Sequence, residues 1–525
     1  MASKLEMDND KEQSEYLAIS LSFLVLVISQ LIVYVMRKFP AILIPETGML
    51  ILFGMCVGGL IRLFDNPGNH LVHSIDKIVS FDETLFFAVL LPPIIFHSGY
   101  AINKPAFMSN IGAIGLLSVV GTLSIAICTG GLMFMFSSFS GVYSTNLVES
   151  MAFGALISAT DPVSVLATFN RVGVKPKLAI LVFGESLLND AMAIVLFRSI
   201  LTYEDDMLDD SKDFSAFGSV LEFLRIFFGS IAVGVFVGFS SALLFKNVEL
   251  WVKDMRQLET ALTITLPYLS YAIAAGLELS GIVSLLFCGM FMSSYTRLNL
   301  SIESEKFLRD FYEALAYLAE TFIFIYLGMA TLTGDGDWSS EAIWFGVCGF
   351  FACLVARLLV VPLCMVVNLT RNSRQQISRS EMFVLWYAGL RGGMAYALAT
   401  ASTNELASES TGRVFESASS IIIFFTVFIC GSTIEHIVRK FDLVDSELQD
   451  SADNNYSFNT QVDPSNPVNH SGIELGHVLK KPSLWSKFEN RVVRPVCVRN
   501  ESEGSRVQQG SLDEGPEIEG DLSAI

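Results

Sequence analysis

Long apolar runs separated by short polar segments dominate the first 440 residues of the chain. A helix needs about 20 mostly apolar residues to cross a bilayer, and thirteen runs are predicted as membrane spans. The predicted spans cover residues 16–36, 43–63, 83–100, 109–137, 148–170, 177–202, 218–246, 256–275, 279–296, 311–331, 341–368, 380–401 and 413–437. The pattern predicts an all-α polytopic membrane domain at 16–440, preceded by a short segment at 1–15 and followed by a tail at 441–525.

Basic residues are distributed unevenly among the loops that join these runs. When the N-terminus is placed outside, one set of loops, from 37–38 to 439–440, holds nearly all of them. The other set holds little besides Lys77 and Lys212. Since short cytosolic loops collect Lys and Arg, the asymmetry predicts a cytosolic tail and a non-cytosolic N-terminus.

The number of runs has a consequence for the architecture. Thirteen spans divide into six, one linker and six, and an odd linker inverts the second half, as in inverted-repeat transporters. Because no convincing residue-level repeat accompanies this division, the inverted repeat is inferred from the count alone.

The composition limits the possible partners. The chain is 52% hydrophobic and 17% charged with a net charge of -19, and an acidic chain is a poor binder of nucleic acid.

The tail is rich in Asp, Asn, Ser and Gly and is predicted to be mostly disordered. Its basic stretch at 480–499, with Trp485 and Phe488, is compatible with a contact to membrane lipids or regulatory proteins, and equally with a solvated linker.

Ionisable side chains near the centre of a predicted span are costly and need a reason. Asp161 lies in ALISATDPVSVL, where Pro162 interrupts the helical hydrogen bonding. A helix broken at mid-membrane exposes backbone groups that bind ions, so Asp161 is a candidate cation ligand. A simple proline kink is the competing interpretation, but it does not explain a carboxylate at that depth.

The segment GESLLNDA places two carboxylates on one helix. Ser186 and Asp190 are four residues apart and share a face, and Glu185 and Asn189 form the adjoining strip. Because these oxygen ligands suit small hard cations, a cation site is favoured over a polar packing seam.

Arg391 lies between glycines in GLRGGMAYA, within the twelfth span. This span corresponds to the one that contains Asp161 if the two halves are related. An arginine at this depth needs a carboxylate partner, and we predict Glu185. Glu320 and Arg357 form a possible second pair, for which a structural role and a transport role are equally open.

Five segments occur in an order typical of one known family. LLPPIIFHSGY, SATDPVSVLATF, FGESLLNDA, ETFIFIYLG and YAGLRGGMAYAL resemble the sodium/proton exchanger family of monovalent cation/proton antiporters over about residues 16–440. Details such as FCGMFMSSYT resemble the endosomal/Golgi branch of that family more than its plasma-membrane branch.

The resemblance implies an inverted-repeat fold in which two broken helices cross at mid-membrane. It also implies a homodimer, with a dimerisation domain and a mobile core domain in each protomer. The implied site residues are Asp190 as the alternating carrier of Na⁺ or K⁺ and of the proton, Ser186, Asp161 and Thr160 as further ligands, Asn189 as a support, and Glu185 paired with Arg391.

These expectations define a function. A single carboxylate that holds either a proton or a monovalent cation has the same charge in both loaded forms, so exchange is expected to be electroneutral. We expect a secondary active transporter and not an enzyme, without a cofactor. It would exchange Na⁺ or K⁺ for H⁺ across an endosomal or Golgi membrane and so regulate lumenal pH. A plasma-membrane exchanger and a cation channel are the alternatives.

Overall fold

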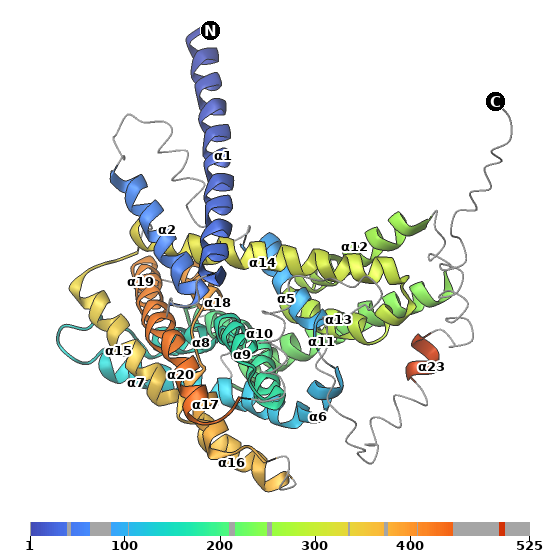
Figure 1. Ribbon diagram of the computed structural model, residues 1–525. Helices are drawn as coiled ribbons and strands as arrows, with labels where there is room; N and C mark the ends of the chain where they lie inside the picture. The colour runs from blue at the N-terminus through green and yellow to red at the C-terminus, as the bar shows by residue number, and fades with distance from the viewer. Residues whose placement is uncertain are drawn as a thin grey trace, which may run out of the picture. The chain divides into compact units, whose positions relative to one another are not determined.

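A computed structural model describes residues 2–38, 44–63, 86–102, 104–208, 216–248, 255–333, 336–371, 376–406, 408–444 and 493–498. Within these residues the secondary structure is helical, apart from an isolated antiparallel bridge between Val174 and Val444 (Figure 1). The prediction of an all-α protein is confirmed for this part of the chain. Most of the tail predicted at 441–525 lies outside the described residues.

The chain divides into two compact units. Unit 1 comprises Met1–Ile94, Asn103–Phe228 and Leu315–Ile473, and unit 2 comprises Ile95–Ile102, Gly229–Ala314 and Glu474–Ile525.

The helices follow this division. Unit 1 contains α1 (Ala2–Lys38), α2 (Glu46–Leu63), η1 (Phe86–Leu90), α6 (Lys104–Gly115), η2 (Leu116–Gly121), α7 (Thr122–Phe136), α8 (Leu147–Ser158), α9 (Val163–Val172), α10 (Pro176–Leu208), α15 (Ser340–Arg357), α16 (Val360–Thr370), α17 (Arg379–Tyr387), α18 (Gly393–Glu405), α19 (Glu409–Phe425), η6 (Thr426–Gly431) and α20 (Ser432–Lys440). Unit 2 contains α12 (Arg256–Gly276), α13 (Gly281–Ser294), η4 (Thr296–Asn299) and α23 (Arg494–Cys497). Three helices contribute residues to both units: α5 (Leu91–Tyr100), α11 (Ala216–Asn247) and α14 (Ile302–Thr333).

Nine helical segments in the described part of the chain are long and apolar enough to cross a membrane, and they coincide with nine of the predicted spans. The described residues of the other four predictions, 83–100, 256–275, 279–296 and 380–401, overlap helices. Two of these helices are short, α12 opens with polar residues, and the last prediction is interrupted between α17 and α18. The chain is therefore a multi-pass membrane protein, while the count of thirteen and the inverted repeat remain predictions.

Local sequence signals explain several helix ends. Asn146 begins α8 through a capping box with Glu149, which satisfies amides that the first turn leaves unpaired. Gly173, at a φ of 73°, ends α9 in the left-handed conformation that glycine adopts without strain. Helix α5 continues directly from the π-helical segment η1, and Pro92 and Pro93 at this junction lack the N–H that would donate to the preceding turn.

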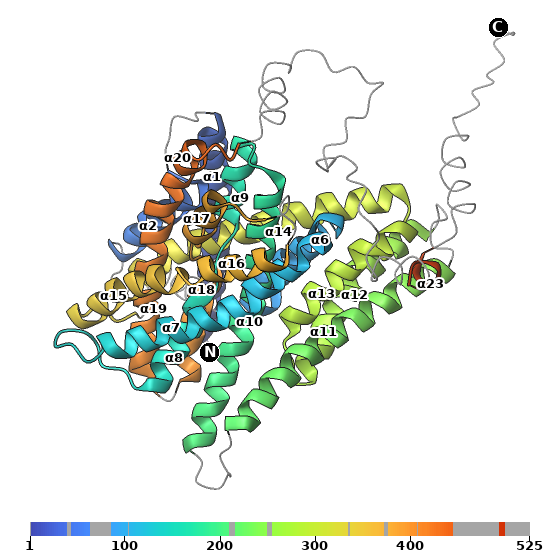
Figure 2. The same ribbon diagram turned by 90° about the horizontal axis from the view of Figure 1, so that it is seen from below.

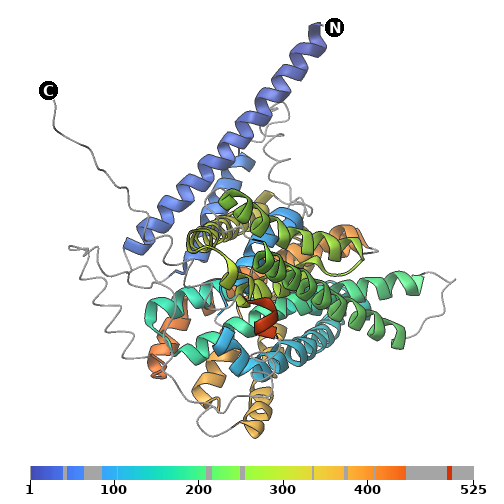
Figure 3. The same ribbon diagram turned by 90° about the vertical axis from the view of Figure 1, so that its right-hand side faces the viewer.

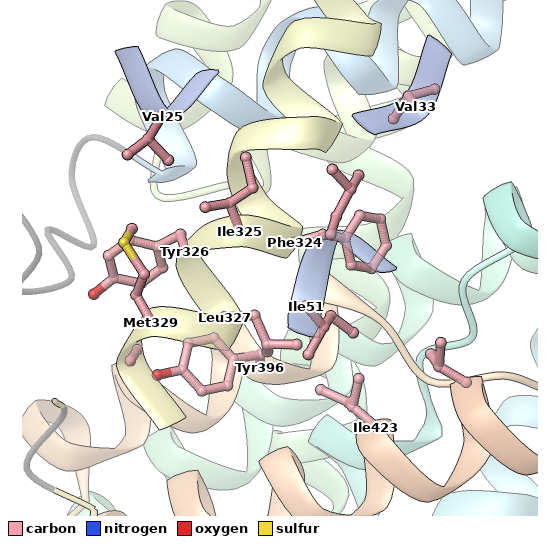
Figure 4. Packing of buried hydrophobic residues seen from close by; sticks show 13 residues of the cluster. Val25, Val33, Ile51, Phe324, Ile325, Tyr326, Leu327, Met329, Tyr396 and Ile423 are labelled. Atoms are coloured by element: carbon pink, nitrogen blue, oxygen red, sulfur yellow. The ribbon is translucent and has the colours of Figure 1, made fainter. Parts of the chain in front are cut away.

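The N-terminal part of unit 1 packs on α14 through apolar side chains (Figure 4). Val25 and Val33 of α1 and Ile51 of α2 gather in one cluster with Phe324 and its neighbours on α14. In a bilayer such contacts act through close packing, because lipid chains are as apolar as the side chains themselves. Elsewhere α1 exposes large apolar side chains, which suits contact with lipid.

The two segments with the predicted carboxylates lie in the interior of unit 1. Seventy-two per cent of the spanning window is buried in both Leu147–Val172 and Pro176–Tyr203, against 17% in Ile19–Lys38. Helix α10 contacts α8, α9 and α18, and the four helices lie together in Figure 1 and, seen from below, in Figure 2. The candidate site is thus enclosed by protein.

Candidate ion-binding site

Two helices of unit 1 are interrupted where the sequence predicts. Helix α8 ends at Ser158 and α9 begins at Val163, and Asp161 and Pro162 lie in the break. Helix α17 ends at Tyr387 and α18 begins at Gly393. Each break leaves carbonyl groups at the end of one half-helix and amide groups at the start of the next without helical partners.

The two breaks cross in direct contact. The backbone N–H of Asp161 donates to the carbonyl oxygen of Leu390, 2.9 Å away. A Cβ atom added to Gly392 would lie 2.4 Å from the Cβ of Asp161, which is far inside van der Waals contact. Glycine is therefore required at this position, and the crossing fixes where the Asp161 carboxyl lies.

Helix α10 brings its hydroxyl against the first break. The Oγ of Ser186 donates to the carbonyl oxygen of Thr160, and the Oγ1 of Thr160 lies 3.3 Å from the same hydroxyl. The structure brings Ser186 and Thr160 together, and their role in ion binding remains a prediction.

The Asn189 side chain has a defined orientation. Its Nδ2 donates to the carbonyl oxygen of Ser158 at 3.0 Å and to the Oγ1 of Thr160 at 3.1 Å. Because a carbonyl only accepts, the nitrogen must face this side. The Oδ1 accepts from the Oγ1 of Thr122 at 2.7 Å. The amide thus joins α10 to α7 and to the end of α8.

Two carboxylates retain an unused acceptor. The Oδ1 of Asp190 and the Oδ2 of Asp161 are buried and accept no hydrogen bond from any residue that the structure describes. The other oxygen of Asp161 accepts the Val163 amide at 2.9 Å. Buried carboxylate oxygens without partners are costly unless a proton or a cation is bound.

The predicted pairing of Glu185 with Arg391 is wrong in this structure. Glu185 instead accepts a hydrogen bond at 3.0 Å from the Nη2 of Arg357, and both side chains are buried. Arg391 directs its Nη1 to the carbonyl oxygens of Ser158 and Ala159, at 2.9 and 3.1 Å. The cause is the end of α8, whose unpaired carbonyls carry partial negative charge and attract the guanidinium.

The predicted pair of Glu320 with Arg357 is wrong for a related reason. Arg357 is occupied by Glu185 and by two carbonyls at the end of α17, those of Trp386 at 3.0 Å and Leu385 at 3.2 Å. Glu320 has no ion pair among the described residues, and its charge interacts with that of Asp161. Sequence reasoning paired Arg357 with Glu320, whereas the structure pairs Arg357 with Glu185.

Some residues of the site were not expected. Thr122 follows the π-helical segment η2, a local geometry that an apolar run does not reveal. The carbonyls of Ser158 and Ala159 belong to the backbone and leave no sequence signal. The partner of Arg357 depends on the crossing of α10, α15 and α17, which periodicity cannot give.

Comparison with known sequences identifies the family. The sequence model of a family described as "Sodium/hydrogen exchanger, transmembrane" matches residues 23–440. The chain belongs to the sodium/hydrogen exchanger family. The match includes all the site residues named above, which lie between Thr122 and Arg391.

Individual relatives extend this result. The exchanger is 39% identical over 509 residues to sodium/hydrogen exchanger 5 of Arabidopsis thaliana, covering 94% of this chain and 96% of the relative. It is 33% identical to sodium/hydrogen exchanger 8 of Homo sapiens, covering 84% of this chain and 74% of the relative. The fold is similar to that of the sodium proton antiporter MjNhaP1 from Methanocaldococcus jannaschii, with a TM-score of 0.62, 18% identity, and coverage of 81% and 99% of the two chains.

Proposed function

We propose that this exchanger moves Na⁺ or K⁺ against H⁺, with Asp190 as the group that binds either ion. One observation carries the proposal: Asp190 and Asp161 each have a buried oxygen without a hydrogen-bond partner, next to the break between α8 and α9. A proton or a small cation stabilises such an oxygen. Ser186, Thr160 and the backbone of the break supply further oxygen ligands of the kind that alkali cations use.

The protonation chemistry is assigned to a single group. Glu185 is paired with Arg357, and the Asn189 amide does not titrate and is bound at both ends. As the family resemblance implies, Asp190 carries the proton in one half-cycle and the cation in the other, while Asp161 and Glu320 keep one protonation state throughout the cycle. Both loaded forms have the same charge, so the exchange is electroneutral at one cation per proton.

The wider function is inferred from sequence motifs of the chain. We assign alternating access to a rigid-body movement of the mobile core domain against the dimerisation domain, in a homodimer. The SATDP and FCGMFMSSYT segments favour an endosomal or Golgi membrane, where such exchange sets lumenal pH and cation content. A plasma-membrane exchanger has the same site chemistry and is distinguished by localisation of the tagged chain.

The test is transport by the purified full chain in proteoliposomes with an internal pH dye. Asp190→Asn is expected to abolish exchange in a series of Na⁺ and K⁺ concentrations, because the amide holds neither a proton nor a cation in the same way. Asp310→Asn makes the same chemical change on an exposed side chain and is expected to exchange normally. Exchange that survives Asp190→Asn rejects the assignment.

A companion variant tests the stoichiometry. Asn189→Asp adds a second titratable group, so it is expected either to stop exchange or to make its rate depend on clamped voltage. An unchanged, voltage-independent rate contradicts the charge argument. Single-channel currents in the unaltered protein would instead indicate a cation channel.

A further inference from the structure

A short helix from the tail occupies a defined place on unit 2. Helix α23 is preceded by residues outside the described part, yet Cys497 is fully buried in a cluster with Ala242 of α11 and Tyr295. Figure 3 shows the helix against the segments of unit 2. Phe239, Phe291, Val493 and Val498 complete the cluster. The contact is thus an apolar cluster with one small side chain, that of Cys497, at its centre.

Hydrogen bonds next to this apolar cluster bind the backbone of the tail. The Nζ of Lys246, in the last turn of α11, donates to the carbonyl oxygens of Pro495 at 2.6 Å and Val496 at 3.0 Å. The Nδ2 of Asn299 donates to the carbonyl oxygen of Cys497 at 2.7 Å and to that of Ala242 at 3.1 Å. The carbonyls that a helix end leaves unpaired are thereby satisfied.

The beginning of the tail is also fixed, but to unit 1. The backbone N–H of Lys175, just after α9, donates to the carbonyl oxygen of Leu443 at 3.1 Å. Its Nζ donates to the carbonyl oxygen of Asp442 at 3.1 Å, and Val174 forms the bridge with Val444. Residues 442–444 are therefore held on unit 1.

We propose that the surface formed by Lys246, Asn299 and Tyr295 is a docking site for residues 493–498 of the chain's own tail. Lys246 and Asn299 recognise backbone carbonyls, which tolerate any side chain at 495 and 496. The apolar cluster around position 497 accepts only a small side chain, because Cys497 is fully buried in it. This site lies in unit 2 and includes none of the proposed ion ligands, so it is independent of the proposed function.

The test measures whether Cys497 is protected in the full-length protein in membranes. The other seven cysteines are replaced, and labelling by a maleimide is timed. The matched control carries Val496→Cys with Cys497→Ala, because Val496 is 46% exposed and Cys497 is 0% exposed. Cys497 is expected to react at least about tenfold more slowly than the control, a factor that corresponds to about 1.4 kcal/mol.

Removal of the polar contacts should release the helix. The pair Lys246→Met and Asn299→Ala is expected to bring the labelling of Cys497 to the rate of the control, while Asn247→Ala, an exposed neighbour on α11, leaves it slow. Sodium-driven proton exchange by the same variants verifies that they are folded. Equal labelling at 496 and 497 in the chain with an intact docking surface, or protection that persists in the paired variant, overturns the proposal.

Discussion

Arg357 connects three helices through one side chain. It belongs to α15, pairs with Glu185 of α10, and donates to two carbonyls at the end of α17. A Cβ atom on Gly389 would lie 2.0 Å from its Nε, so the glycine leaves the space that the guanidinium fills. An arginine in a predicted span therefore serves here as a cap for one half of a broken helix as well as an ion-pair partner.

Arg357→Met is expected to destabilise the protein by about 3–5 kcal/mol, because it leaves Glu185 buried without a partner. Adding Glu185→Gln should recover much of this loss, since the orphaned charge is removed. The measurement is thermal unfolding of the purified variants in detergent, arranged as a double-mutant cycle. The same cycle with Arg391→Met is the control. Coupling of Glu185 to Arg391 instead of Arg357 would contradict the pairing described above.

A second residue-level prediction concerns Thr122. Thr122→Val keeps the shape of the side chain but leaves the Oδ1 of Asn189 without its donor, at a cost of about 1–3 kcal/mol for a buried acceptor. Thr122→Ser retains the hydroxyl and is expected to retain most of the stability. The measurements are the unfolding temperatures and the transport rates of the Thr122→Val and Thr122→Ser variants. Equal behaviour of the valine and serine variants would show that the hydrogen bond is unimportant.

At the scale of elements, the breaks were predictable and their partners were not. Pro162 and the glycines around Arg391 predict the two helix interruptions, because proline lacks the backbone N–H donor and glycine weakens a helix. Asp161 and Asp190 stand out since charges are rare in apolar runs. The partner of Glu185 depends on the angles at which α10, α15 and α17 cross, and no one-dimensional pattern contains that information.

The crossing of the breaks gives a prediction for Gly392. Gly392→Ala introduces a methyl group into the Asp161 side chain, so it is expected to separate the breaks and to reduce or abolish exchange. Gly131→Ala, on α7, has open space within 4 Å of its added Cβ and should leave stability equal or slightly higher. Both are compared by proteoliposome transport. Full activity of Gly392→Ala would mean that the close contact is dispensable.

At the scale of the whole molecule, the predicted orientation rests on the distribution of basic loops. Residues 493–498 reach the ends of α11 and η4, which the charge pattern places on the same, cytosolic side as the tail. A tail on the opposite side of the membrane has no access to that surface. The segments 64–85 and 209–215, which contain Lys77 and Lys212, lie outside the described residues.

This orientation predicts the glycosylation pattern. Asn299 begins a sequon, yet it is 5% exposed and binds two carbonyls, and its side is predicted to be cytosolic. We expect no glycan there when the chain is expressed in eukaryotic cells and treated with a glycosidase. Asp209→Asn creates a sequon in the loop predicted to be non-cytosolic and is expected to gain a glycan. A glycan on Asn299 would contradict the predicted cytosolic location of this residue.

The proposed electroneutral cycle, in which the bound amide of Asn189 does not titrate, has a consequence for the energetics of transport. When one cation is exchanged for one proton, membrane potential does no net work on the cycle. Net transport then stops when the ratio of cation concentrations across the membrane equals the ratio of proton concentrations, and it reverses beyond that point. A proton pump in the same membrane would therefore determine how far the cation accumulates, through acidity alone and whatever the voltage.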